Sequence, residues 1–201
     1  MPRFEFPHWL ALIFGLFFAV LAIDPVSRTV WIAEMIPVVL VFGGLVLTYP
    51  RFRFSNTAYS LMAVWLFWHT VGGHYTFANV PFDWVSELIG AERNHFDRVG
   101  HFAVGLYAYA AAEWMLRQGH CRYVPANLFA LLLVMGIAAG YEIIEWWYAV
   151  LEGGDAGIEF LGSQGDIWDA QKDMLADTLG AIVALLLFAA LRPDRTMPSR
   201  A

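Results

Sequence analysis

Long apolar blocks, separated by short polar segments, dominate this chain and limit what it can fold into. Apolar residues make up 59% of the 201 residues, whereas charged residues make up only 15%. Soluble domains carry about a quarter charged residues, so this composition fits a membrane protein. The apolar residues run continuously and do not alternate with polar ones, which excludes the strands of a membrane β-barrel. The sequence therefore predicts an all-α, polytopic membrane bundle.

Six segments of the chain are apolar and long enough to cross a bilayer as helices, since about 20 residues span its hydrocarbon core. The first segment could be read as a signal peptide, because Arg3 precedes it. However, Glu5 lies in its short head and further apolar segments follow directly, so we expect a helix that is not cleaved. The segments form a single integral membrane domain over residues 1–201, and the predicted spans are 8–23, 33–49, 56–73, 98–117, 124–150 and 174–191.

The distribution of Lys and Arg predicts the orientation of this bundle. Short cytoplasmic loops are enriched in these residues, so the richer side is expected to be the cytoplasmic one, and both termini lie on it. The net charge of −6 and the lack of a basic patch exclude nucleic-acid binding. The predicted cytoplasmic residues are Arg3, Arg51, Arg53, Arg117, Arg122, Arg192, Arg195 and Arg200, and the predicted outer ones are Arg28, Arg93, Arg98 and Lys172.

In this orientation the two long outer loops, 74–97 and 151–173, are acidic. Loops of this length between packed helices usually have a function. The second one, between the fifth and sixth predicted helices, is also rich in glycine, which would allow it to fold back over the helix ends. Its glycines are Gly153, Gly154, Gly157, Gly162 and Gly165.

Ionisable residues lie near the outer ends of four predicted helices. Asp97 and His101 are spaced i, i+4 at the start of the fourth helix, so they share one face. The sixth helix has the same spacing between its aspartates. A carboxylate at the bilayer centre costs roughly 2.5–3.5 kcal/mol on insertion scales, so such residues are usually paired or functional. The candidate metal ligands in this group are His69, His74, Asp97, His101, Asp173 and Asp177.

Carboxylates this close together cannot all ionise in a partly desolvated space. A divalent metal could neutralise them, the acids could share protons, or histidines together with Arg98 and Lys172 could supply the counter-charge. Mixed histidine and carboxylate ligands on facing helices are typical of metal sites in bundles. Such ligands suit Zn²⁺ or Mn²⁺ better than Ca²⁺. The sequence leaves these three interpretations open.

Glu142 and Glu145 are the candidate catalytic residues of the fifth helix. Neither a helix cap nor the helix dipole favours acids near a helix C-terminus, so we expect one of them to act as a general base. Arg98 and Lys172 could hold a phosphate, and arginine is the better bidentate partner. The candidate substrate-binding residues are Arg98, Asp166, Asp169, Gln171 and Lys172.

Several of these residues also have a purely structural interpretation. Asp97 and Asp169 could cap the N-termini of their helices, where aspartate is favoured. His69 and His74, on either side of a Gly-Gly pair, could bond backbone carbonyls. Glu113 stands alone at the inner end of the fourth helix and is predicted to be a surface residue.

Small residues at four-residue spacing predict close approach between helices. The sixth helix carries Ala176, Gly180 and Ala184 on one face, and the fifth carries Gly136 and Gly140. These faces would bring the last three helices together below the acidic residues. The single cysteine, Cys121, excludes a disulfide framework and is expected to be an inert thiol.

Three strings of this sequence resemble the YjdF family of bacterial inner-membrane proteins, a domain of unknown function. They are HTVGGHYT at 69–76, NHFDRVGHF at 94–102 and FLGSQGDIWDAQKDM at 160–174. The resemblance covers most of the chain and implies a multi-pass protein of the inner (plasma) membrane, without implying a particular activity.

A weaker similarity is to VanZ-like membrane proteins, which are associated with glycopeptide resistance. It rests on the string DRVGH at 97–101, on Glu142, and on the acidic run from Asp173 to Gly180. The glycine-rich loop and the second glutamate, Glu145, depart from that pattern, so a shared substrate does not follow.

Three functions are compatible with these residues. The first and main one is a metal-assisted enzyme that acts on a membrane lipid or lipid-linked envelope substrate at the outer leaflet. The second is a small ion- or proton-coupled transporter, because intramembrane acids also form proton relays. The third is a structural or accessory protein whose acids only pair with histidines. The first two predicted spans carry almost nothing polar at depth and no internal repeat is present, which counts against transport.

Overall fold

The computed structural model describes residues 4–196, and the regular structure in that range is entirely helical. The all-α prediction is confirmed. The elements are α1 (Phe6–Leu21), α2 (Arg28–Thr48), α3 (Asn56–Tyr75), the short 3₁₀ helix η1 (Phe77–Asn79), α4 (Asp83–Ile89), α5 (Phe96–Gly105), α6 (Tyr107–Arg117), α7 (Tyr123–Glu152), α8 (Gly154–Leu161), α9 (Asp169–Leu191) and α10 (Pro193–Thr196).

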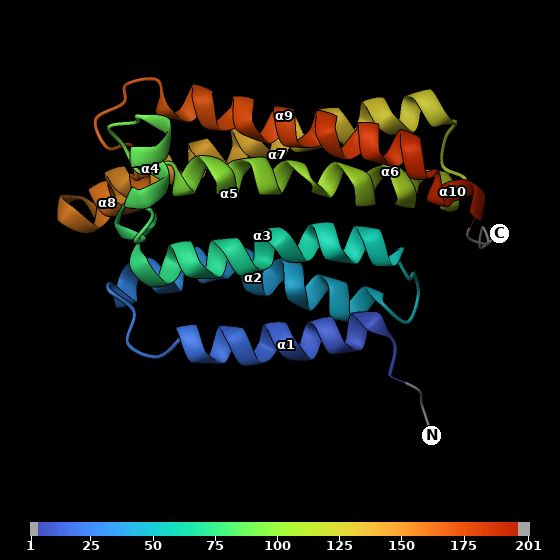
Figure 1. Ribbon diagram of the computed structural model, residues 1–201, viewed down its shortest axis with the longest axis horizontal. Helices are drawn as coiled ribbons and strands as arrows, with labels where there is room; N and C mark the ends of the chain where they lie inside the picture. Colours follow the sequence, from blue (N-terminus) through green and yellow to red (C-terminus); the bar gives the residue numbers. More distant parts are fainter. Residues whose placement is uncertain (1–3, 197–201) are drawn as a thin grey trace.

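The six apolar segments correspond to six roughly parallel rods, of which α5 and α6 together form one (Figure 1). These two helices meet at Leu106, which itself has helical dihedral angles, so the rod continues with only a local break. By length and composition, α2, α7 and α9 are each able to cross a membrane, and α1 is a shorter apolar helix.

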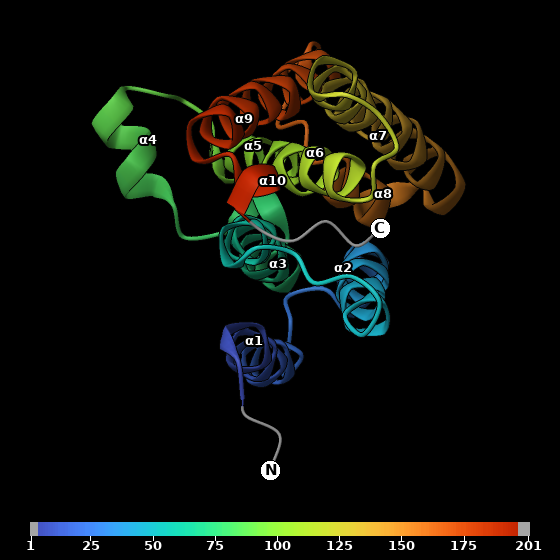
Figure 2. The same cartoon turned by 90° about the vertical axis from the view of Figure 1, so that its right-hand side faces the viewer.

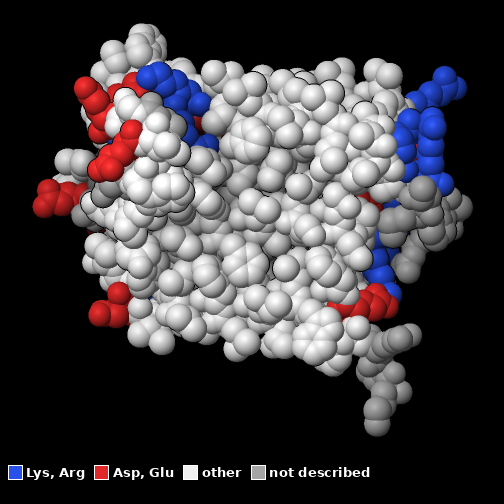
Figure 3. All heavy atoms as spheres, in the orientation of Figure 1, with Lys and Arg blue, Asp and Glu red and all other residues white. Residues whose placement is uncertain are grey.

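On the face of the molecule seen in Figure 3, the charged side chains lie at the two ends of the rods, and a broad uncharged band separates them. The end that holds α4 and α8 is mainly acidic with some basic groups, and the opposite end, where both termini lie, is mainly basic (Figures 1 and 3). Arg3 and Arg200, which contributed to the predicted orientation, lie outside the described residues. An uncharged band of this kind suits a bundle whose rods lie along the membrane normal.

A very close crossing joins α5 to α9. A Cβ atom placed on Gly180 would overlap the carbonyl oxygen of Phe102, and one on Gly105 would overlap the carbonyl oxygen of Asp177. Only glycine at both positions therefore lets the two backbones touch. The small-residue face predicted on the last helix is the face that packs, and Ala184 on it is fully buried.

The corresponding prediction for α7 is wrong. Gly136 and Gly140 have nothing within 4 Å of an added Cβ, so no described part of the chain approaches them. The buried face of α7 consists instead of Ala126, Ala130, Val134 and Ala138. The glycines and the buried residues both recur every four positions, but the two sets are offset by two residues. This offset corresponds to a rotation of about 200° around the helix axis, so the glycines lie on the outer face.

The remaining rods are arranged around α3. Both α1 and α2 pack against α3 on one side, and α5, α6, α7 and α9 form a group on its other side (Figure 2). In addition, α2 contacts α8. The outer loop predicted over 151–173 is partly helical, because α8 starts directly after Gly153, whose φ of +65° ends α7. This segment lies across the acidic end of the bundle.

We predict that Gly180→Ala destabilises the protein, whereas Gly136→Ala does not. The added methyl group at Gly180 would push α5 and α9 apart, an overpacking that typically costs about 1–3 kcal/mol. Thermal unfolding of the two variants in detergent would measure the difference. Equal melting temperatures for both variants would contradict the close crossing.

Candidate functional site

A cavity of about 180 Å³ lies among α2, α3, α5 and α7 in the half of the bundle that is capped by α8. We call it the outer chamber. Its inner part is apolar, with Trp65, Val104 and Val134 among its lining residues, and Phe160 to Gly162 cover its outer end. The ionisable side chains that line it come from six helices: Glu34, His69, Asp97, His101, Tyr107, Tyr141, Glu145 and Asp177.

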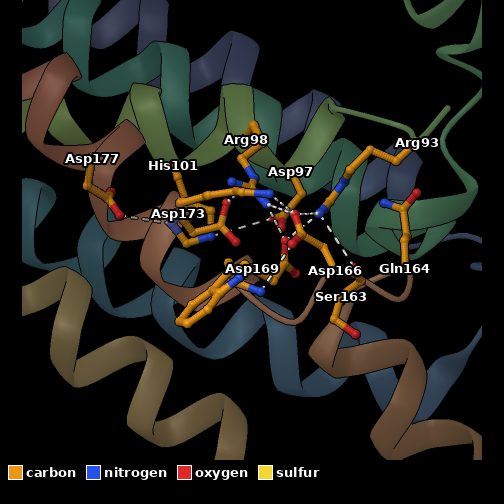
Figure 4. A network of polar contacts seen from close by, with 12 residues as sticks. Arg93, Asp97, Arg98, His101, Ser163, Gln164, Asp166, Asp169, Asp173 and Asp177 are labelled. Carbon is orange, nitrogen blue, oxygen red and sulfur yellow. Dashed lines mark hydrogen bonds and ion pairs between the residues drawn. The ribbon is translucent and has the colours of Figure 1, made fainter. Parts of the chain in front are cut away.

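One wall of the outer chamber is formed by the first turns of α5 and α9, which the glycine crossing holds together. Candidate ligand atoms of Asp97, His101 and Asp173 all lie within 4.8 Å of one another (Figure 4). Asp97 Oδ1 is 3.7 Å from Nε2 of His101, one helical turn away. The i, i+4 spacing on α5 therefore places both groups against the aspartates of α9, as the sequence predicted.

Asp177 fixes the orientation of the His101 ring. Its Oδ2 atom is 2.9 Å from Nδ1 of His101, and both side chains are buried. A carboxylate can only accept a hydrogen bond, so Nδ1 carries the proton and, in the neutral ring, Nε2 keeps its lone pair. That lone pair lies on the side of Asp97 and Asp173. A histidine held by a carboxylate in this way is typical of metal ligands.

Two carboxylate oxygens near this wall have neither a hydrogen-bond partner nor an ion-pair partner among the described residues: Oδ1 of Asp177, which is 1% exposed, and Oε1 of Glu142. Burying an oxygen that carries negative charge without a partner is costly. These two atoms therefore indicate that the site accepts a proton or a cation.

The two predicted catalytic acids of α7 face this wall from the other side. Glu145 lines the outer chamber, whereas Glu142 does not. Both interact electrostatically with Asp97 and His101. The structure thus brings Glu142 and Glu145 to the group of α5 and α9 residues, in agreement with their predicted placement.

The opposite wall contains an acid that the sequence analysis missed. Glu34 of α2 is only 2% exposed, and its Oε2 atom lies 3.0 Å from Nε2 of His69 and 3.2 Å from the hydroxyl of Tyr141. The expectation that the first two spans carry almost nothing polar at depth is therefore wrong. The sequence feature that could have indicated this buried acid is its position one turn before Pro37, a proline in the interior of the helix.

His69 lines the outer chamber on the wall opposite the α5–α9 group, whereas His74 is not among the residues that line it. His69 is paired with Glu34 and lies 3.1 Å from its backbone carbonyl as well. His74 lies further out, with Nδ1 2.7 Å from the carbonyl oxygen of Leu21 and its ring edge-on to Trp31. Its role is to hold the α1–α2 connection, which is the structural alternative given above for this residue.

A network of ion pairs holds together the segments beside the outer end of the chamber. Arg93 Nη1 lies 2.5 Å from Oδ1 of Asp169, and Arg98 contacts the same oxygen (Figure 4). Asp166 contacts both arginines and Lys172, whose Nζ is 2.6 Å away. The hydrogen bond from Lys172 lowers the pKa of Asp166 to about 2, so this carboxylate stays charged at neutral pH.

Two further hydrogen bonds add to this network. The Asn94 backbone N–H donates to the side-chain oxygen of Gln164, and the Gln164 side-chain N–H donates to the Asn94 carbonyl, each at 3.0 Å. Gln164 has a φ of +48° and Gly165 a φ of +83°, which is the left-handed region that favours glycine. We call residues 162–168 the lid, because this segment joins α8 to α9 across the end of the chamber.

The lid network changes the interpretation of the predicted substrate-binding residues. Arg98 lies 2.8 Å from Asp173 through Nε and also contacts Asp166 and Asp169. The cations of the network, Arg93 included, are matched by as many aspartates, so no cationic excess is left for a phosphate. Gln171 is exposed on α9. Arg93, which holds the lid, was not among the predicted site residues.

Glu113, at the other end of the bundle, is not a surface residue. It is completely buried, and it accepts hydrogen bonds from the Ser55 hydroxyl (2.6 Å), the Ser55 backbone N–H (2.8 Å) and Arg117 (2.5 Å). Arg117 also donates to the carbonyl of Arg53 at 2.7 Å. This cluster fixes the start of α3 to the end of α6. Its carboxylate is fully paired, so it is a structural clamp.

Comparison with known proteins identifies the family. Residues 6–194 match the family described as predicted membrane protein (DUF2238). The chain belongs to this family. It is also 37% identical, over 168 residues, to the inner membrane protein YjdF of Escherichia coli strain K12, and this match covers 81% of the chain and 79% of that protein. No solved structure matches the chain.

The resemblance to the YjdF family is confirmed, and this DUF2238 family member is an integral protein of the bacterial inner membrane. The similarity to VanZ-like proteins stays a prediction. The region matched by the family includes the whole outer chamber, the lid and the Glu113 clamp.

We predict that Asp166→Asn loosens the lid, while Asp155→Asn, on the exposed surface of α8, does not. The substitution removes the charge that bridges Lys172 and the two arginines. Hydrogen exchange of the 162–168 peptide would be faster in the first variant only. Because the pKa of Asp166 is lowered from 3.8 to about 2, its contacts are complete above pH 4 and are lost only as the pH falls toward 2. After correction for intrinsic rates, protection of the wild-type lid should therefore be equal at pH 7 and pH 5.

Proposed function

We propose that all six rods cross the inner membrane and that both termini lie in the cytoplasm. The uncharged band and the position of both termini at one end support this arrangement (Figures 1 and 3). The end with the termini holds Arg51, Arg53, Arg117 and Arg122, and short cytoplasmic loops are enriched in arginine. The outer chamber and its lid would then face the outer leaflet.

Cysteine labelling would test this orientation. In a Cys121→Ser background, Asp155→Cys should react with a membrane-impermeant maleimide in intact cells, since α8 would lie outside. His120→Cys, in the exposed α6–α7 connection, should react only after the membrane is opened. The reverse pattern would contradict the proposed orientation.

We propose that the outer chamber binds a divalent cation through Asp97, His101 and Asp173, and that the protein is a metal-assisted enzyme acting on a lipid or lipid-linked envelope substrate. The single observation that carries this proposal is the convergence of these ligand atoms within 4.8 Å, with the second nitrogen of His101 held by Asp177. Three protein ligands that leave a coordination position open are typical of catalytic zinc sites. The histidine and carboxylate set would also accept Mn²⁺.

The proposed chemistry assigns a role to each neighbouring group. A divalent cation here would supply Lewis acidity toward an ester or phosphoryl oxygen. Glu145, which lines the chamber, would take the proton from an attacking water molecule, and Glu142 would be the second candidate for this role. Asp177 would keep His101 in the required tautomer. The apolar part of the chamber would hold the hydrocarbon portion of the substrate.

The lid network supports a substrate that is recognised mainly through its apolar part. Its arginines are neutralised by aspartates, and the inner chamber is lined by groups such as Trp65 and Val134. A phosphate would have to displace Asp166 or Asp169 from the arginines before it could bind there.

A structural role for the polar network is the alternative, and paired acids such as Glu34 would fit it. A purely structural role would leave Oδ1 of Asp177 and Oε1 of Glu142 buried without partners. In the metal proposal, a bound cation would supply positive charge to this group of acids. Ion transport has no such support: the chamber ends at apolar side chains, and the buried Glu113 at the other end is already paired.

Metal binding by purified protein in detergent tests the proposal. We predict that the wild type binds one equivalent of Zn²⁺ or Mn²⁺, and that His101→Ala or Asp173→Ala abolishes this binding. Asp177→Asn should weaken it by about 10- to 100-fold, as expected for a carboxylate that orients a ligating histidine.

The matched control is Glu152→Gln, an exposed acid at the end of α7, which should bind metal like the wild type. Thermal unfolding without metal would show whether each variant is folded. Unchanged metal affinity in a folded Asp173→Ala variant, or no binding by the wild type, would contradict the metal site.

A further inference from the structure

The outer chamber is closed along the bundle axis at both ends. Toward the cytoplasmic end, its lining is formed by large side chains, among them Trp65 and Tyr107. Toward the outer surface, Phe160 and Leu161 of α8 cover it, and the ion pairs of Arg93 and Arg98 hold the adjoining lid. A molecule dissolved in the membrane therefore needs a sideways path to reach it.

The line between α2 and α7 is the candidate for such a path. Both helices line the chamber, α2 with Glu34, Pro37 and Val41 and α7 with residues 134–145. The backbones of these two helices make at most sparse contact in the described part of the chain, although each packs closely against other helices. Figure 2 shows both rods to the right of α3, with α2 below and α7 above. We call the line between them the α2–α7 seam.

The surface beside the seam is apolar. On α2, Ile36 and Leu40 are exposed, and on α7, Leu133 and Ile137 are exposed. Ile137 also lines the chamber, so the apolar outer surface is continuous with the apolar inner lining. A charged or strongly hydrated solute would not enter through such a surface, whereas a hydrocarbon chain would.

One hydrogen bond crosses the seam. The Tyr141 hydroxyl on α7 donates to Oε2 of Glu34 on α2 at 3.2 Å. The same carboxylate is 3.0 Å from His69 on α3. If Tyr141 turns away, Glu34 keeps its partner on α3, so the seam can open without leaving a buried carboxylate unpaired. Pro37, one turn along α2, lacks the N–H that would complete the helix there and provides a point at which α2 can bend.

We propose that the α2–α7 seam is a lateral entrance through which the hydrocarbon chain of a membrane lipid reaches the outer chamber, and that the Tyr141–Glu34 hydrogen bond holds this entrance closed. This inference rests on the proposed function in one respect, since it takes the hydrocarbon chain that enters to be part of the substrate. The substrate class is then a lipid dissolved in the membrane. Tyr141 is a positioning residue in this arrangement.

Labelling of a cysteine inside the chamber tests the entrance. Ala138→Cys, in a Cys121→Ser background, places a thiol at a buried position that lines the chamber. The reagents are a long-chain alkyl maleimide, which dissolves in the bilayer, and a small water-soluble maleimide. The protein is reconstituted in vesicles of phosphatidylethanolamine and phosphatidylglycerol, without added metal.

With Tyr141→Phe, the alkyl maleimide should label this thiol about tenfold faster, because a hydrogen bond to a carboxylate no longer holds the closed state. Met135→Cys, on the exposed face of α7, should react at the same rate with and without the Tyr141→Phe substitution, and serves as the matched control. Asp166→Asn, which loosens the lid, should accelerate the water-soluble reagent and leave the alkyl reagent unchanged.

Two results would overturn the proposal. One is an unchanged rate of alkyl labelling in a folded Tyr141→Phe variant. The other is faster alkyl labelling in Asp166→Asn, which would show that lipids enter past the lid. A phospholipid with a photoreactive group in one acyl chain gives a second measurement: crosslinks to residues 134–141 are expected, and crosslinks confined to the outer face of the bundle would contradict the entrance.

These measurements are independent of the metal site. Loss of metal binding in the wild type with intact seam labelling would remove the proposed chemistry and keep the entrance. Metal binding without seam labelling would keep the chemistry and overturn the entrance, so that the substrate would need another route.

Discussion

The backbone contact between α5 and α9 decides where the polar groups of the outer chamber lie. Gly105 and Gly180 meet without room for a Cβ atom, so the two helices approach more closely than larger residues would allow. Each helix carries acids or a histidine at four-residue spacing on the side of this contact. The crossing therefore converts two separate helical patterns into one compact group, with His101 bonded to Asp177 and close to Asp97 and Asp173.

Three clusters of charged side chains in this protein are neutralised to different extents. Glu113 is fully paired with Ser55 and Arg117 and stabilises the inner end of the bundle. The lid aspartates are matched by arginines and Lys172 near the surface. In the group on α5, α7 and α9, by contrast, acids outnumber the bases and two carboxylate oxygens have no partner among the described residues. Incomplete pairing of this kind separates a candidate functional site from the structural clusters, because burying an unpaired charge is costly unless the site has another use for it.

Access to the chamber follows from the same arrangement. Since α5, α7 and α9 pack tightly and α2 packs on α3, the facing sides of α2 and α7 are left without close packing in the described part of the chain. The polar link there, Tyr141 to Glu34, uses a carboxylate that also has a partner on α3. Several ion pairs hold the lid at the outer, aqueous end of the bundle. At the α2–α7 seam, which faces the membrane, one hydrogen bond between the described residues joins the two helices. The easier opening therefore faces the hydrocarbon.

The amino-acid sequence alone determined the class of this protein, the helical segments and the placement of ionisable residues near one end of four helices, because composition and helical periodicity are local properties. It also predicted that Asp97 and His101 share a face and that Gly180 packs. Only the tertiary structure decided the partner of each buried group: His69 pairs with Glu34, His74 with a backbone carbonyl, and Glu113 with Ser55. The same holds for α7, where the alanine face packs and the glycine face does not. The physical reason is that the rotation of a helix about its own axis depends on all of its neighbours at once, and a rotation of half a turn exchanges the buried and the exposed side chains.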